Sequence, residues 1–175
     1  MATHCVLLTG GIASGKSTVS QYFQDQYHIQ TVDTDRIAKK LTTPNTPLGQ
    51  AILKQLRTHF PDVINDELIL NRAVLRQKIF QDKTAKYLLE SILHPLIYQE
   101  CITEIKAING AYCLVAIPLL HAQSPYLQLS TQIITVEASM DLQIERLCVR
   151  DNISLELAQK MITSQPSKAS RLRLA

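Results

Sequence analysis

The chain contains four short runs rich in apolar residues, at residues 5–8, 29–32, 112–117 and 132–136. Apolar runs of this length are typical of strands in a sheet that is covered on both faces. Between them, apolar residues recur at helical spacing instead. Strands that alternate with helices predict an α/β fold built on a parallel sheet.

Helical periodicity fills most of the stretch 37–109, where Leu, Ile and Phe side chains recur every fourth residue between 48 and 60. Breaks at 42–47 and 61–66 separate helices, and Pro95 predicts a helix boundary or a kink. This stretch has no strand–helix–strand rhythm. It is either a substrate-binding subdomain or only a cover for one sheet face.

Helices are also expected beside the strands. One follows the first run and ends near residue 26, and Ser139 is expected to cap a helix over 140–150. A second late helix is expected over 154–164.

Composition narrows the class of protein. The 175 residues are 46% apolar and 19% charged, which is ordinary for a globular domain. A net charge of +3 is too small to argue for nucleic acid, although Lys168, Arg171 and Arg173 form a basic stretch. That stretch would either meet a polyanionic substrate or lie solvated. We expect a cytoplasmic protein with free cysteines, because the four cysteines are scattered and the chain has no leader-like or membrane-length apolar run.

The most informative motif is GGIASGKS at residues 10–17, which matches the phosphate-binding P-loop pattern between a strand and a helix. Gly10 and Gly15 can adopt positive φ, so that successive N–H groups point inward at an anion. Lys16 would contact the β- and γ-phosphates, and the Ser17 hydroxyl would ligate Mg²⁺. The residues expected to bind ATP are Gly11, Ile12, Ala13, Ser14, Gly15, Lys16, Ser17 and Thr18.

A second group of candidate residues follows the next strand and lies on a late helix. Asp33 ends the second apolar run, so it is expected at the same sheet edge as the loop, as a general base or a Mg²⁺ ligand. Asp35 is expected to cap a helix that begins near residue 36. Arg146 and Arg150 share one helix face, where they would stabilise phosphoryl charge or lie solvated.

The motifs that are absent favour a small-molecule kinase. The chain lacks N-K-x-D and D-x-x-G, and no aspartate follows the two late strands as a motor ATPase would need. We therefore expect ATP as phosphoryl donor with Mg²⁺, a small-molecule acceptor, and neither a nucleic acid nor a membrane partner.

Several stretches together resemble the dephospho-CoA kinase family. They are LTGGIASGKST at 8–18, D-T-D with Ile37 and Ala38, L-E-S-I-L-H-P at 89–95, P-L-L at 118–120, and Gln143, Arg146, Arg150 and Gln165. The resemblance implies a nucleoside-monophosphate-kinase-like, three-layer α/β/α fold in one domain. Its core would comprise 1–35 and 110–145, with a helical coenzyme-A-binding insert at 36–109 and a lid with the following segment at 146–175.

The resemblance also implies an activity, the transfer of the γ-phosphoryl group of ATP to the ribose 3′-hydroxyl of dephospho-CoA. Asp33 is then the base, Lys16 and Ser17 bind phosphate and Mg²⁺, and Arg146 and Arg150 belong to the lid. His94 falls on a family motif, although a structural role at a helix junction is the simpler interpretation.

The chain departs from the family pattern at a few places. Ala13 replaces a glycine, which is acceptable if φ is negative there, and His121 and Ala122 stand where the family has an apolar residue and a glutamate. Family members continue past residue 175 with a strand and a helix, so we expect an exposed strand edge. Two alternatives stay open: a P-loop kinase for another acceptor, and a nucleotide-binding protein without turnover.

Overall fold

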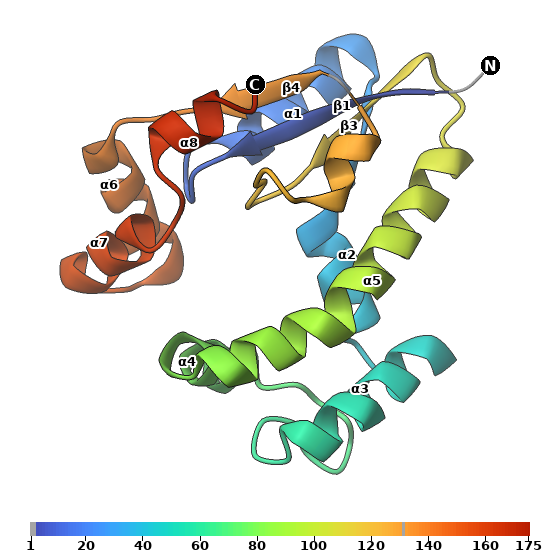
Figure 1. Cartoon of the computed structure of the whole chain (residues 1–175), viewed down its shortest axis with the longest axis vertical. Coiled ribbons are helices and arrows are strands. Elements are labelled where there is room, and N and C mark those ends of the chain that lie inside the picture. The colour runs from blue at the N-terminus through green and yellow to red at the C-terminus, as the bar shows by residue number, and fades with distance from the viewer. Residues whose placement is uncertain (1–2, 131) are drawn as a thin grey trace. The chain divides into compact units, whose positions relative to one another are not determined.

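The structure is a computed structural model that describes residues 3–130 and 132–175. The chain divides into two compact units. The first comprises 1–34 and 103–175, and the second comprises 35–102. We describe each unit by itself (Figure 1).

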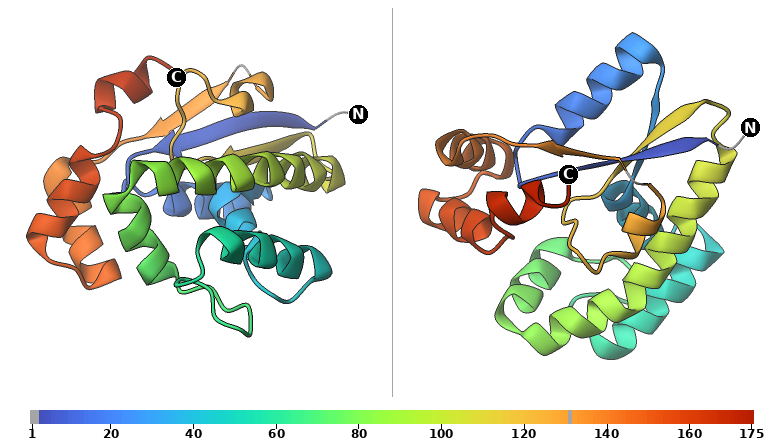
Figure 2. Two further views of the ribbon diagram at one scale, coloured as in Figure 1. Left: turned by 60° about the horizontal axis from the view of Figure 1, so that its bottom comes forward. Right: turned by 45° about the horizontal axis from the view of Figure 1, so that its top comes forward.

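The first unit contains the whole sheet. Its elements are β1 (His4–Gly10), α1 (Lys16–Tyr27), β2 (Gln30–Asp33), β3 (Tyr112–Ala116), a 3₁₀ turn (Pro125–Gln128), β4 (Ile133–Val136), α6 (Met140–Asp151), α7 (Leu155–Thr163) and α8 (Lys168–Leu172). The four strands are parallel and lie in the order β2-β3-β1-β4 (Figures 1 and 2). A parallel sheet flanked by helices confirms the predicted α/β class.

Burial explains why β1 runs through the middle of the sheet. Leu7 and Leu8 are fully buried, and they point to opposite faces because side chains alternate along a strand. Leu8 packs with Leu114 of β3, and Val19 and Phe23 of α1 cover this cluster. In the described part of the chain β4 pairs only with β1, and its four residues are half-buried, as expected at a sheet edge.

The late helices begin where the sequence predicts. The Ser139 hydroxyl accepts a hydrogen bond from the Leu142 N–H at the start of α6, and Ser154 does the same for α7. These caps satisfy N–H groups that a helix cannot pair internally. The caps therefore fix where the α6–α7 hairpin starts and turns.

The second unit is helical, as the periodicity of 37–109 predicts. It holds α2 (Thr34–Leu41, from residue 35), α3 (Pro47–His59), α4 (Arg72–Gln81) and α5 (Lys83–Ala107, to residue 102). Leu53, Leu56 and Phe60 are almost completely buried. Leu48, which heads the predicted stripe, is 52% exposed, so the stripe is shorter than expected.

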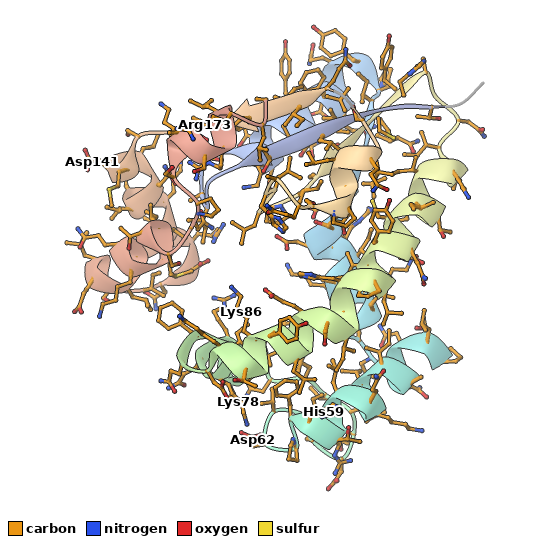
Figure 3. All side chains as sticks on the ribbon, in the orientation of Figure 1. His59, Asp62, Lys78, Lys86, Asp141 and Arg173 are labelled. Carbon is orange, nitrogen blue, oxygen red and sulfur yellow. The ribbon has the colours of Figure 1, made fainter. Side chains whose placement is uncertain are left out.

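Polar contacts tie the ends of these helices together. Lys78 donates to both carboxylate oxygens of Asp62, at 2.7 and 2.8 Å (Figure 3). This hydrogen bond holds the pKa of Asp62 below its ordinary value. The Arg72 guanidinium donates to the carbonyl oxygens of Lys39 and Thr42, which are among the last that α2 leaves unpaired.

One local prediction is narrowed and another needs correction. Of the boundary or kink expected at Pro95, the boundary is excluded, because α5 runs through Pro95 as one helix whose axis bends along its length (Figure 1). Helix α2 begins at Thr34 instead of near residue 36, so Asp35 lies within its first turn instead of capping it. A carboxylate in a first turn still interacts favourably with the helix dipole.

The cysteines are free thiols, and strand register brings two of them together. Cys5 of β1 pairs in register with Cys113 of β3, and their sulfur atoms are 3.5 Å apart. Their separation in sequence gave no indication of this contact. In the described residues, no helix combines the length and the hydrophobicity that crossing a membrane would require.

Candidate active site

The loop that follows β1 has the backbone conformation that the P-loop motif requires. Gly10 has φ of 154° and Gly15 has φ of 107°, which L-residues with a side chain rarely adopt. A Cβ atom on residue 10 would also lie 2.2 Å from the Val136 carbonyl oxygen. Both predicted glycine positions are therefore needed for the shape of the loop.

The side chain of Lys16 lies over this loop. Its Nζ donates to the carbonyl oxygens of Gly10 and Gly11, both at 2.9 Å. This arrangement holds the positive charge of the ammonium group over the loop, where the motif places the phosphates. Ser17 and Thr18 follow in the exposed first turn of α1, where a helix N-terminus favours an anion.

Ser14 adds a polar group that fits an oxyanion ligand. Its side chain is 5% exposed, and its hydroxyl oxygen has no hydrogen-bond partner within the described residues. A buried hydroxyl in that state destabilises a fold unless a ligand or water pairs with it.

Ala13 does not meet the condition of a negative φ under which it would replace glycine without cost. Its φ is 56°, in the left-handed region, which is unfavourable for a residue with a Cβ atom. Contacts hold it there: Ile12 and Ala13 pack against Ile144, Leu147 and Ala158 of α6 and α7. The α6–α7 hairpin thus supports the loop from outside.

We expect Ala13→Gly to raise the free energy of unfolding by about 1 kcal/mol, because glycine adopts positive φ without the steric cost. Urea denaturation monitored by circular dichroism measures the change. Ala51→Gly, at an exposed position inside α3, is the matched control and should lower stability by about 1 kcal/mol. A loss of stability in both variants would contradict the argument.

Arg146 and Arg150, predicted as one pair, have different contacts. The Arg146 Nη1 donates to the carbonyl oxygens of Ala13 and Ser14, at 3.2 and 3.3 Å. The guanidinium of this α6 residue therefore lies beside the P-loop. Arg150 forms a two-bond ion pair with Asp151, at 2.7 and 2.9 Å. Both arginines are exposed.

Asp33 ends β2 at the same sheet edge as the loop. It pairs in register with Ala116 of β3, which itself pairs with Leu8 of β1. Because adjacent strands lie about 4.8 Å apart, Asp33 is about 10 Å from the axis of β1. It is half-buried. A carboxylate-bearing residue therefore ends its strand at the same sheet edge as the P-loop.

The basic stretch near the end of the chain contains a residue that sequence analysis placed wrongly. Arg171 is 7% exposed, and its Nε and Nη2 each donate to a carboxylate oxygen of Glu137 at 2.8 Å. Arg173 and Lys168 are exposed, and Figure 3 labels Arg173, which directly follows α8. Nothing in the local pattern around either partner indicates a pairing across 34 residues.

Comparison with known proteins identifies the family. The family model described as dephospho-CoA kinase matches residues 4–175. The chain belongs to the dephospho-CoA kinase family. It is therefore a kinase, as the motif set predicted.

Individual relatives agree with this family. The chain is 38% identical over 169 residues to a dephospho-CoA kinase of Vibrio parahaemolyticus, covering 96% of this chain and 80% of the relative. It is 40% identical to a dephospho-CoA kinase of Coxiella burnetii, covering 96% of this chain and 82% of the relative.

Solved structures agree as well. The dephospho-CoA kinase of Campylobacter jejuni superposes with a TM-score of 0.65 and 25% identity, covering 98% of this chain and 84% of that one. The TT1252 protein of Thermus thermophilus superposes with a TM-score of 0.82 and 21% identity, covering 99% of this chain and 85% of that one. This likeness supports the fold alone.

Proposed function

We propose that this chain transfers the γ-phosphoryl group of ATP to the ribose 3′-hydroxyl of dephospho-CoA, giving coenzyme A and ADP. Membership of the family supports the reaction. The observation that supports the residue roles is the shared sheet edge, where Asp33 ends β2 and the P-loop with Lys16 follows β1.

In the proposed mechanism, the loop residues Gly11–Thr18 bind the phosphates of ATP. Backbone N–H groups and the Ser14 hydroxyl are the hydrogen-bond donors, and the Lys16 ammonium neutralises charge on the β- and γ-phosphates. Arg146 lies on the P-loop carbonyls and can turn its exposed guanidinium toward the transferring group.

Asp33 is the proposed general base. Its carboxylate accepts the proton of the 3′-hydroxyl as the oxygen attacks the γ-phosphorus. The bond between that phosphorus and the bridging oxygen breaks, and the electron pair leaves with ADP. Most of the rate enhancement comes from positioning the two substrates and from stabilising the charge of the transition state. The reaction needs no covalent enzyme intermediate.

The donor atoms at this edge fit a magnesium ion. Ser17 offers an exposed hydroxyl and Asp33 a carboxylate, and Mg²⁺ prefers oxygen ligands completed by substrate phosphates. Mg²⁺ would neutralise charge that develops on the phosphate oxygens. Among the described residues there is no cluster of three or more acidic, His or Cys side chains that could hold a metal ion.

The remaining sequence predictions stay part of the proposal. The helical residues 36–109 are the proposed acceptor-binding insert, and 146–175 the lid with its following segment. His94 is exposed within α5, which has no junction there, so the expected structural role at a helix junction loses its basis. A cytoplasmic location and the absence of nucleic-acid partners also stay predictions.

The test is ADP release from Mg-ATP in the presence of dephospho-CoA, beside shikimate, gluconate and nucleoside monophosphates. We expect release only with dephospho-CoA. Release only with another acceptor would contradict the proposal and favour a different P-loop kinase. ATP binding without ADP release for any acceptor would instead favour a nucleotide-binding protein without turnover.

A further inference from the structure

One peptide unit of the P-loop has hydrogen-bond partners on both sides. The carbonyl oxygen of Gly11 accepts from the Lys16 Nζ, and the N–H of Ile12 in the same peptide unit donates to the Gln165 Oε1 at 2.8 Å. A peptide unit is planar, and its C=O and N–H point in opposite directions. Holding the N–H at Gln165 therefore turns the C=O toward Lys16.

Gln165 is itself held in place. It lies two residues after the end of α7, and its neighbour Pro166 accepts a hydrogen bond from the Arg171 Nη1 at 2.5 Å. The same guanidinium makes the two-bond ion pair with Glu137, the residue after β4. A charge pair at 8% and 13% side-chain exposure is rigid, because breaking it would leave a buried charge unpaired.

The space around Gly11 shows that this support is tight. A Cβ atom on residue 11 would lie 2.8 Å from the Gln143 Oε1 and 3.3 Å from the Arg171 Nη2. Gln143 is 5% exposed and donates to the Ala138 carbonyl oxygen at 2.9 Å. The outer side of the Gly11–Ile12 turn is thus lined by polar side chains that are fixed by their own hydrogen bonds.

We infer that Gln165 is a positioning residue for nucleotide binding, which acts through the Gly11–Ile12 peptide to hold Lys16 over the P-loop. The Glu137–Arg171 pair anchors the segment that carries it. Arg171 is neutralised by Glu137, so its role is support and not phosphate binding. The inference rests on the proposed function, in which ATP is the nucleotide.

The variant Gln165→Met tests the positioning role of Gln165. Methionine has a similar length but offers the Ile12 N–H only a weak acceptor. We expect the dissociation constant for ATP to rise about tenfold, the scale of one lost hydrogen bond to a positioned group, with the KM for dephospho-CoA unchanged. Gln159→Met, at an exposed position on α7, is the matched control and should bind like the parent. Gln165→Asn, too short to reach Ile12, replaces the methionine variant if that one does not fold.

Two further readouts distinguish positioning from a general structural role. Amide hydrogen exchange should accelerate at Ile12 in Gln165→Met. In addition, Gln165→Met should weaken ATP binding much less in a Lys16→Met background, because residues that act through one another are not additive. Additive effects, or unchanged exchange at Ile12, would overturn the inference.

The failure of the inference can be told apart from the failure of the proposed function. A parent chain that binds ATP but transfers nothing to dephospho-CoA contradicts the proposed function alone. A Gln165→Met chain that binds ATP as tightly as an active parent contradicts this inference alone.

Discussion

Asp33→Asn is expected to lower kcat about a thousandfold, within the range that a positioned general base contributes. Asparagine has nearly the same shape as aspartate but cannot accept the proton of the attacking hydroxyl. Asp33 is half-buried at the end of β2, so the substitution should leave the sheet intact. The measurement is steady-state ADP release with dephospho-CoA, with circular dichroism to confirm folding.

The control for this variant is Asp35→Asn, which removes a carboxylate two residues away. Asp35 is exposed in the first turn of α2, so activity should stay near that of the parent. Equal losses in both variants would indicate a general effect of charge and contradict the role of Asp33 as base.

A magnesium titration separates the two roles proposed for Asp33. If the carboxylate acts only as base, the Mg²⁺ concentration that gives half-maximal rate should be the same in Asp33→Asn and in the parent. If the carboxylate also ligates the ion, that concentration should rise in the variant. Parent-like kcat at every Mg²⁺ concentration would exclude both roles.

The features that could be predicted from sequence are those with a local signal. Four apolar runs, the Ser139 cap and the glycine-rich loop each depend on residues within a few positions of one another. Propensity and hydrogen bonding to the nearest backbone decide such features, so the pattern predicts them without knowledge of the rest of the chain.

The features that could not be predicted depend on contacts distant in sequence. The Gln165–Ile12 hydrogen bond joins residues 153 positions apart, and no periodicity encodes it. The left-handed φ of Ala13 was missed for the same reason, because packing of α6 and α7 on the loop overrides the preference of alanine. The insertion of β3 between β1 and β2 also has no local signature.

Lys16→Met is expected to reduce kcat/KM for ATP by at least about a thousandfold. The substitution removes a positive charge from the β- and γ-phosphates, and one preorganised donor to a developing charge is worth about 10²–10³-fold in rate. It also removes the two hydrogen bonds that join Lys16 to the carbonyl oxygens of Gly10 and Gly11, so the loop loses an internal link as well.

Lys16→Arg should not restore this activity, because a planar guanidinium cannot reproduce the compact ammonium that lies on two carbonyl oxygens. Lys106→Met is the matched control: it removes an exposed lysine near the end of α5, in the same unit of the chain, and should leave kcat/KM unchanged. Calorimetry of ATP and ADP binding shows whether the loss of kcat/KM comes from weaker nucleotide binding or from slower phosphoryl transfer. If Lys16 acts on the γ-phosphate mainly during transfer, kcat falls more than affinity does, whereas parent-like values of both would remove Lys16 from the mechanism.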